Sequence, residues 1–298
     1  MITLIEALNF RCLRYISRPM DNFHVLVGPN ASGKTTFLDV VAFLGDLVSG
    51  GIEKAVAGRT RNFEDLVWRR SGPSFELAIE ARIPETLSDH LADTGLDTIR
   101  YEVALALDSK TQEIQLQAET VLLKAGKCHD GTSEQLEFFP GRVSPPRSIL
   151  LGVRGRDTRA VVQKVPAGND NFYSETYVQK GKGWVPTFKL GPRRSALANL
   201  PEDESKFPVA TWLKALLSEG VQQLILNSLL IRKASPPGQG RSFRPDGSNL
   251  PWVVADLERN APERLRDWVA HLQTALPDLE SIWTLEREDD KHRYLMLG

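Results

Sequence analysis

The sequence predicts a mixed α/β fold, and three observations lead to that prediction. A short apolar run at residues 23–27 leads into a glycine-rich loop, and a long apolar stretch from Phe37 to Leu47 follows the loop. Further along, three stretches alternate polar and apolar residues, as half-buried strands do. Toward the C-terminus, apolar residues recur at spacings of three and four, which is the period of an amphipathic helix.

The glycine-rich loop is Gly28-Pro29-Asn30-Ala31-Ser32-Gly33-Lys34-Thr35, and we call residues 28–35 the phosphate loop. It matches the pattern Gly-x4-Gly-Lys-[Ser/Thr], which binds the phosphates of a nucleotide. Its glycines permit backbone torsions that are closed to other residues, so successive N–H groups can turn inward around an anion. The positive end of the following helix strengthens such a site. The loop predicts a P-loop NTPase core, with an adjoining antiparallel β-sheet and a helical segment toward the C-terminus.

Two side chains of the loop have distinct predicted roles. Lys34 adds a positive charge that can reach the β- and γ-phosphates, and it is the predicted catalytic residue. The hydroxyl of Thr35 is a hard oxygen ligand for Mg2+, which bridges the same phosphates. The complete set of predicted nucleotide contacts is Gly28, Pro29, Asn30, Ala31, Ser32, Gly33, Lys34, Thr35, Thr36 and Arg11.

The loop together with Thr36 resembles that of the RecF/SMC-like branch of ABC-class ATPases. Residues 5–13, Ile-Glu-Ala-Leu-Asn-Phe-Arg-Cys-Leu, look like the opening strand of that branch. The segments at 246–251 and 276–279 resemble stand-alone bacterial ATPases of the OLD-like and anti-phage types. The resemblance implies that ATP and Mg2+ are the cofactors, and that ATP drives a homodimer or higher oligomer in DNA repair or anti-phage defence, with DNA as a partner.

The resemblance also suggests that a basic residue near Arg11 and Arg14 contacts the nucleotide. Two surface arginines at the end of a strand are the alternative for this pair. A glutamine that senses the γ-phosphate is expected between Lys34 and Lys110, but none occurs there.

The composition is typical of an ordinary soluble protein. Of the 298 residues, 41% are hydrophobic and 25% charged, and the net charge of −1 restricts any nucleic-acid surface to a local patch. The two cysteines are too few for a disulfide framework, and Cys128-His129 lacks the spacing of a zinc site. Neither a signal peptide nor a membrane span is expected, so we predict a cytoplasmic protein without a membrane partner.

Three regions are expected along the chain. Residues 1–125 form a P-loop ATPase lobe with an antiparallel sheet, whose strands are predicted at 3–10, 23–27, 74–83, 101–108 and 113–119. Residues 126–200 form a basic β-rich insertion. Residues 201–298 form a helical segment and closing strands, and we expect the chain to continue into a second ATPase half. Helices are predicted at 250–259 and 262–276, and the apolar stretch 207–230 has a helical face between Val209 and Leu217. A strand is also predicted at 224–230.

The insertion gathers basic residues and leaves two interpretations open. The basic residues are Arg142, Arg147, Arg154, Arg156, Arg159 and Lys164, and Trp184 follows beside further lysines. A DNA-facing surface and a solvated surface insertion both fit this composition.

Hydrolysis requires an acidic residue after a second apolar strand, to hold Mg2+ and activate water. The nearest candidate is Asp108, although Ser109 follows where a glutamate is wanted, and the acids between Glu286 and Asp290 come next. An ATPase therefore remains the first hypothesis. The alternative is a non-hydrolysing nucleotide-binding regulatory subunit that holds or releases an effector such as a nuclease.

Overall fold

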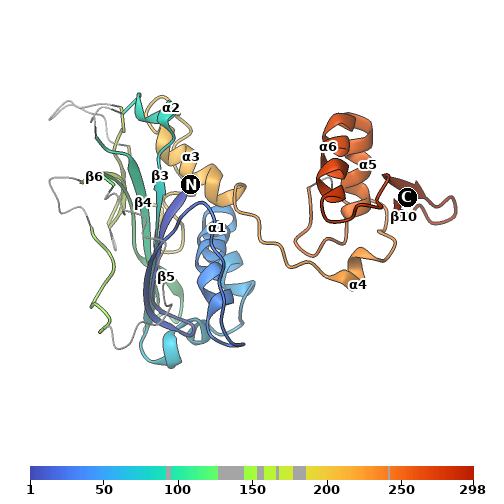
Figure 1. Cartoon of the computed structure of the whole chain (residues 1–298). Helices are drawn as coiled ribbons and strands as arrows, with labels where there is room; N and C mark the ends of the chain where they lie inside the picture. Colours follow the sequence, from blue (N-terminus) through green and yellow to red (C-terminus); the bar gives the residue numbers. More distant parts are fainter. Residues whose placement is uncertain (92–94, 127–143, 153–157, 166–167, 177–185, 241) are drawn as a thin grey trace. The chain divides into compact units, whose positions relative to one another are not determined.

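The computed structural model of the chain divides into two compact units (Figure 1). It describes residues 1–91, 95–126, 144–152, 158–165, 168–176, 186–240 and 242–298. The N-terminal unit is Met1–Val221 and the C-terminal unit is Gln222–Gly298. The expected boundaries at 125/126 and 200/201 both fall inside the N-terminal unit.

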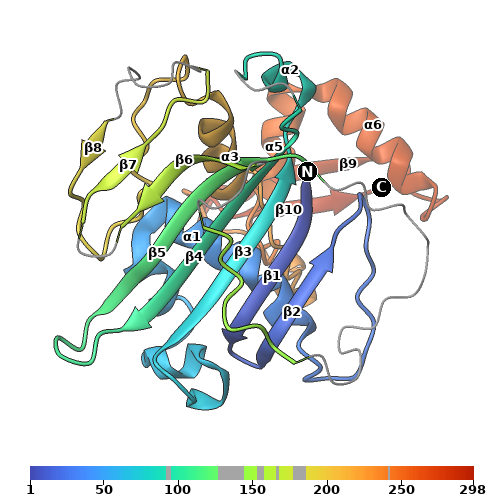
Figure 2. The same ribbon diagram turned by 90° about the vertical axis from the view of Figure 1, so that its left-hand side faces the viewer.

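The N-terminal unit is built on one eight-stranded sheet in the order β2-β1-β3-β4-β5-β6-β7-β8 (Figure 2). Every neighbouring pair is antiparallel. The strands are β1 (Ile2–Phe10), β2 (Leu13–Pro19), β3 (Ser74–Arg82), β4 (Thr98–Leu107), β5 (Ile114–Lys124), β6 (Thr158–Lys164), β7 (Asp170–Phe172) and β8 (Thr187–Phe188). The fold is thus mixed α/β with a large antiparallel sheet.

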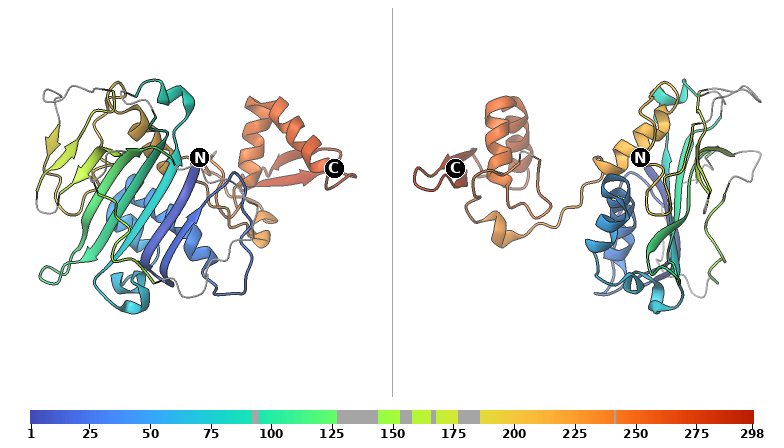
Figure 3. Two further views of the ribbon diagram at one scale, coloured as in Figure 1. Left: turned by 60° about the vertical axis from the view of Figure 1, so that its left-hand side comes forward. Right: turned by 180° about the vertical axis from the view of Figure 1, so that it is seen from behind.

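Two helices cover one face of this sheet, α1 (Lys34–Ala57) and α3 (Pro208–Ser218) (Figure 3). The α1 helix bends at Gly51, and a short helical stretch continues to Ala57. Gly45 allows close packing of the two helices, because a Cβ there would lie 2.6 Å from the carbonyl oxygen of Leu217. The remaining short helices are α2 (Glu85–Ser88), η1 (Phe63–Leu66) and η2 (Trp68–Arg70).

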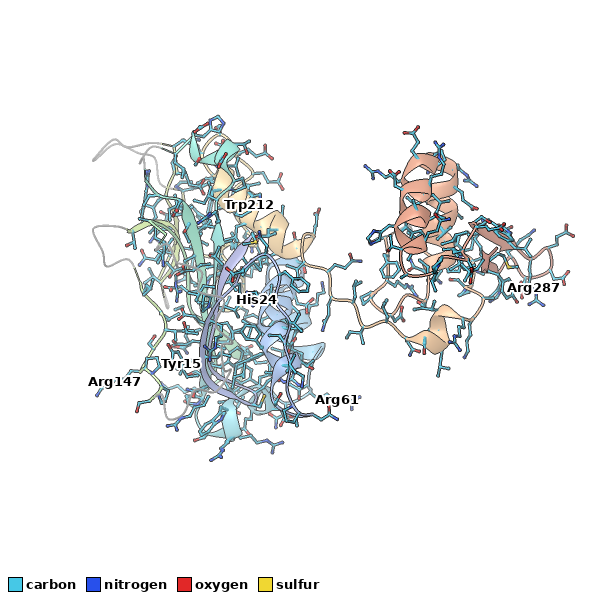
Figure 4. All side chains as sticks on the ribbon, viewed as in Figure 1. Tyr15, His24, Arg61, Arg147, Trp212 and Arg287 are labelled. Atoms are coloured by element: carbon cyan, nitrogen blue, oxygen red, sulfur yellow. The ribbon has the colours of Figure 1, made fainter. Side chains whose placement is uncertain are left out.

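An aromatic cluster lies between α1 and the sheet. The rings of Phe10, Phe43 and Phe75 lie 5.1–5.7 Å apart between centroids, and Phe63 stacks on Phe75 at 5.6 Å. Alternation along β3 and β4 directs Phe75, Leu77, Ile79, Ile99, Tyr101, Val103 and Leu105 to this apolar core. Figure 4 labels Trp212, which packs against this core from α3.

The opposite face of the sheet carries charge. Arg100 is 2% exposed, and its guanidinium contacts three carboxylates, those of Glu6 at 2.7 Å, Glu80 at 3.0 Å and Glu102 at 2.9 Å. Lys124 donates to Glu80 at 2.6 Å. Because a buried charge is costly unless it is paired, these contacts allow Arg100 to be buried under the chain that crosses this face.

Residues 148–152 cross this charged face in extended form without joining the sheet. Arg100 donates to the carbonyl of Ile149, and Glu102 accepts from the N–H groups of Leu151 and Gly152, each at 3.0 Å. Side-chain contacts with the sheet thus replace strand pairing in this segment.

Two fully buried glutamates hold residues 196–197 and the start of α3 on the face of the sheet that the helices cover. Glu119 accepts from Tyr101 Oη and from the N–H groups of Ala196 and Leu197. Glu175 accepts from the N–H groups of Val209 and Ala210 at 2.7 and 2.8 Å, in the first turn of α3. Burial raises the pKa of Glu175 to about 7, and these N–H groups and Arg159 act in the opposite direction.

The C-terminal unit packs two helices on a two-stranded antiparallel sheet. Its elements are α4 (Ser228–Ile231), α5 (Leu250–Asn260), α6 (Pro262–Gln273), β9 (Ile282–Glu286) and β10 (Arg293–Leu297). A small core joins Val254 of α5 to Leu279 and Ile282. The two predicted helices and the closing strand pair are confirmed here, but the strand predicted at 224–230 is wrong. That stretch is irregular up to α4, and Asn227 caps α4 by accepting from Leu229 and Leu230.

Candidate phosphate-binding site

The phosphate loop leads directly into α1, as the sequence predicts. Gly33 is the N-cap with φ 90°, a left-handed conformation that favours glycine, and Ala31 is also left-handed at φ 64°. The helical ladder begins where the Phe37 N–H donates to the Gly33 carbonyl at 2.8 Å. The N–H groups of Lys34, Thr35 and Thr36 precede that bond, and the first turn contains no acidic residue. This end of α1 therefore retains its attraction for an anion.

The Lys34 ammonium lies within the curve of the loop. Its Nζ donates to the carbonyl oxygens of Gly28 and Pro29, both at 2.7 Å, and to Ser32 Oγ at 3.3 Å. The side chain therefore points back over the loop and away from the apolar core. A phosphate held by the loop would lie beside this charge.

Adjacent threonines of α1 have different environments. Thr36 is buried, and its Oγ1 accepts from Cys12 Sγ at 3.2 Å. Thr35 is exposed. Of the two residues only Thr35 is exposed, and its contact with a metal ion and the nucleotide contact of Thr36 remain predictions.

The turn between β1 and β2 lies against the first turns of α1. Arg11 donates to Asp39 at 2.8 Å, and Asp39 also pairs with Arg59 at 2.7 Å. The side chains of Asp39 and Arg59 are 11% and 9% exposed, so this is a largely buried ion pair. Arg11 is thus brought to the helix that follows the phosphate loop, while its nucleotide contact remains a prediction.

Sequence reasoning missed Asp39 and Arg59. Asp39 interrupts an apolar helical stretch, and a lone acid there is a signal of a buried partner. The partner lies twenty residues away, beyond the bend of α1, so no local pattern links them.

A second basic group lies beside the same turn. The guanidiniums of Arg14 and Arg69 lie over the Trp68 ring, at 5.1 and 4.7 Å from its centroid. Arg69 and Arg70 are both left-handed, with φ 52° and 53°. Arg14 is thus part of a cation–aromatic contact, which matches its interpretation as a surface arginine.

The strand predicted at residues 23–27 is wrong. These residues are in no strand, and Phe23, Val25 and Val27 are 82%, 68% and 84% exposed. A strand requires a paired neighbour and covered faces, and no strand of the described sheets pairs with this stretch. His24, labelled in Figure 4, contacts the Asp21 N–H just before it. The predicted helix after the loop is therefore confirmed and the predicted strand before it is wrong, while the P-loop core as a whole stays a prediction.

The acidic candidates for hydrolysis are held in turns. Asp108 Oδ1 accepts from the N–H groups of Lys110 and Thr111, both at 2.8 Å, and these hydrogen bonds lower the pKa of Asp108. Asp290 pairs with Arg287 at 3.2 Å in the turn between β9 and β10. Local turn chemistry explains both carboxylates.

The predicted basic insertion divides into inward and outward residues. Lys164 forms a buried pair with Asp170 at 2.7 Å, and Arg159 donates to the Ser174 carbonyl at 2.6 Å, so both make internal contacts. Arg147 is exposed and is labelled in Figure 4. Arg142, Arg154, Arg156, Trp184 and the Cys128-His129 pair lie outside the described residues, which contain no cluster of three metal-ligating side chains.

The α1 helix has the length and mean hydropathy, 1.4, of a membrane span. Of that apolar window, 61% is buried inside the unit. Contact with the sheet and α3 explains its composition as that of a core helix.

Comparisons with known proteins give one family match, which spans the segment from residue 23 to residue 122. Residues 23–122 match the family model described as "AAA domain, putative AbiEii toxin, Type IV TA system". This match confirms the predicted resemblance to a bacterial AAA-type ATPase over that part of the chain. No curated protein matches the chain.

Among solved structures, the chain is similar to one titled "Crystal structure of the SmcHead bound to the C-winged helix domain of ScpA". The identity is 18% and the TM-score 0.29, with 40% of this chain and 35% of that chain covered. The chain thus spans about a third of that chain's length.

Proposed function

We propose that this protein binds Mg-ATP through residues 28–35 and is an ATPase of the ABC class. The observation that carries the proposal is the junction of the phosphate loop with α1. A left-handed Gly33, an inward Lys34 and an exposed Thr35 meet at a helix end that has no acid of its own. The match of residues 23–122 to an AAA domain supports it.

The resemblance extends the proposal to partners. ATP binding would drive a homodimer or higher oligomer in the cytoplasm, coupled to DNA repair or anti-phage defence. DNA and an effector nuclease are the proposed macromolecular partners.

Substituting Lys34 tests the phosphate site. Lys34→Ala should abolish ATP binding measured by calorimetry, because each charge-assisted hydrogen bond lost costs about 1.5–3 kcal/mol. The matched control is Lys54→Ala, which removes an exposed lysine elsewhere on α1 and should leave ATP affinity unchanged. Undiminished ATP affinity of Lys34→Ala would falsify the assignment of the loop.

The adjacent threonines test the metal. Thr35→Val should lower ATP affinity much more in Mg2+ than in EDTA, because it removes an oxygen ligand and keeps the shape. Thr36→Val removes a hydroxyl that contacts Cys12 and should show no such dependence on Mg2+. Equal losses for Thr35→Val in both conditions would leave Thr35 as a helix-start residue only.

The alternative function is a regulatory subunit that binds ATP without hydrolysing it. It is favoured by the turn contacts of Asp108 and Asp290, since these contacts hold both acidic candidates in local turns. Phosphate release separates the two functions. Residues 1–298 alone should turn over well below roughly 1 s⁻¹, since each missing electrostatic element costs about 10²–10³ in rate. If residues 1–298 hydrolyse ATP at that rate and the Lys34→Ala variant does not, the catalytic carboxylate lies within this chain.

A further inference from the structure

A groove on the N-terminal unit lies between α2 and α3, which are side by side in Figures 1 and 3. Its volume is about 810 Å³, and we call it the α3 groove. One wall is a stripe along α3 with residues at spacings of three and four, namely Pro208, Thr211, Trp212 and Ala215. A second wall is formed by Leu87 of α2 and by His90 just after it. The remaining lining residues, Thr176, Glu204 and Ser205, include two that immediately precede α3.

The walls of the α3 groove are held in place by the core beneath them. Leu87 and Trp212 are half-buried and pack on the apolar core, so part of each side chain still faces the groove. Glu175 holds the first turn of α3 through two N–H groups. Thr176 Oγ1 donates to the Ser205 carbonyl at 3.0 Å. The groove is therefore preorganised, which reduces the conformational entropy lost when a partner binds.

The α3 stripe is suited to contact with another helix. Thr211 and Ala215 have small side chains, so a second helix can approach α3 closely beside Trp212. The stripe from Pro208 to Ala215 extends about 10 Å along the axis of α3, which matches two turns of a partner helix. An added strand would instead require a sheet edge, and the edges of the eight-stranded sheet are β2 and β8. The shape of the groove therefore favours a helical occupant.

Negative charge predominates in the two segments that supply most of the walls, residues 85–90 and 202–215. Their acids are Glu85, Asp89, Glu202, Asp203 and Glu204, and their lysines are Lys206 and Lys214. Asp203 pairs with Lys206 at 2.7 Å, whereas the other four acids form no ion pair with any residue that the structure describes. With His90 counted as neutral, these segments have a net charge of −3, against −1 for the whole chain.

We propose that the α3 groove binds a basic amphipathic helix of a partner protein. Apolar residues of that helix at i, i+3, i+4 and i+7 fill the groove beside Trp212, and its lysines or arginines lie near Glu202 and Glu204. Nucleic acids and anionic lipid surfaces are disfavoured, because they carry the same sign of charge as the groove. The groove shares no residue with the phosphate loop, so the proposal does not rest on the proposed ATPase function.

Fluorescence anisotropy with a labelled synthetic peptide tests the proposal on the full chain. The probe is a peptide of about 18 residues, long enough to form a helix, with leucine along one helical face and lysine elsewhere. It should bind saturably with a Kd of about 100 µM or lower. A peptide with glutamate in place of every lysine should not bind, because it carries the charge of the groove. A scrambled lysine peptide has no apolar face and should bind about tenfold more weakly or less.

Substitutions in the chain locate the binding. Ala215→Lys places a long cationic side chain in the groove at an exposed position of α3, and it should weaken binding of the lysine peptide by about tenfold or more. The matched control is Ala57→Lys, the same change at an exposed alanine that ends α1, which should leave the affinity unchanged. Glu202→Gln combined with Glu204→Gln should weaken binding about 2- to 30-fold and reduce its dependence on salt, since exposed ion pairs are weak and screened.

Three results of the binding experiments each overturn the proposal. These are no saturable binding of the lysine peptide, equal binding of the scrambled peptide, and equal losses in Ala57→Lys and Ala215→Lys. Sedimentation velocity without peptide tests a second copy of the chain as the occupant. A dimer that Ala215→Lys dissociates would assign the groove to that copy and overturn the basic partner, whereas the same sedimentation coefficient for wild type and Ala215→Lys supports it. Melting temperatures show that each variant is folded, and Ala215, Glu202 and Glu204 belong to no hydrophobic core cluster.

Discussion

The two flanks of the phosphate loop have similar composition and opposite environments. Before the loop, Phe23, Val25 and Val27 are between 68% and 84% exposed. After it, Phe37, Val40 and Phe43 of α1 are at most 1% exposed. Both flanks read as buried elements in the sequence, but only the helix has a surface to bury against.

The difference shows that an apolar pattern favours burial but does not determine whether the segment is buried in the folded chain. The α1 helix satisfies its own backbone and needs only apolar neighbours, which the sheet and α3 provide. A strand must also find a hydrogen-bonding neighbour, and no strand of the described sheets pairs with residues 23–27. Exposed apolar residues of this kind mark a surface suited to further contact.

Removing a ring on the buried flank should have the largest effect. Phe43→Ala should lower the free energy of unfolding by about 3–5 kcal/mol, because it opens a cavity among Phe10, Phe75 and α1. Chemical denaturation with a circular dichroism readout measures it. A loss below about 1 kcal/mol would mean that the ring cluster is not packed in solution.

Breaking the ion pair beside the loop should have the next largest effect. Asp39→Ala removes one of the two carboxylates that pair with the largely buried Arg59, the other being Asp46 at 2.9 Å, and should cost up to about 3 kcal/mol in the free energy of unfolding. The control is Asp65→Asn at the exposed pair with Arg70, which should change the denaturation midpoint far less. Equal effects of the two variants would contradict the burial of the Asp39–Arg59 pair.

Glu175 makes the anchoring of α3 dependent on pH. Its pKa is about 7 in the folded chain against 4.5 as the ordinary value, so the folded state binds more protons between these values. The contribution of Glu175 is fully present below about 4.5 and is lost as pH rises through about 7. Glu175→Gln should therefore remove a fall in stability across this interval, measured as melting temperature against pH. A wild-type slope of the opposite sign from this group would show that its N–H donors and Arg159 outweigh burial.

The smallest effect is expected on the exposed flank. Val25→Thr and Val27→Thr should each change the free energy of unfolding by no more than about 0.5 kcal/mol, as surface substitutions do. They should also reduce binding of a hydrophobic dye, since they lower the exposed apolar area. Destabilisation comparable to that of Phe43→Ala would show that this flank is covered in solution.

Local sequence patterns predicted most of the helices and strands, because the periodicity of apolar residues follows the geometry of each element. Alternation identified β3, β4 and β5, since each strand directs one set of side chains to the apolar core. Spacings of three and four identified α3, α5 and α6. The pattern was weakest where strands are short or polar, so β2, β7 and β8 were missed.

Within the candidate site, the motif identified the phosphate loop but not its surroundings. Gly33, Lys34 and Thr35 are neighbours in sequence, so one local pattern contains them. The ion pair of Asp39 with Arg59 and the stacking of Arg14 on Trp68 join residues from separate elements. Only the folded chain brings those partners together.

The sequence by itself determined the phosphate loop, the helix after it and the alternating strands, because each depends on residues within a few positions of one another. The tertiary structure decided which apolar segments are buried, and so corrected the strand at residues 23–27. It also decided that Lys164 and Arg159 face inward and that Asp108 belongs to a turn. Burial and ion pairing depend on partners that are distant in sequence, and only the arrangement of the sheet and helices selects them.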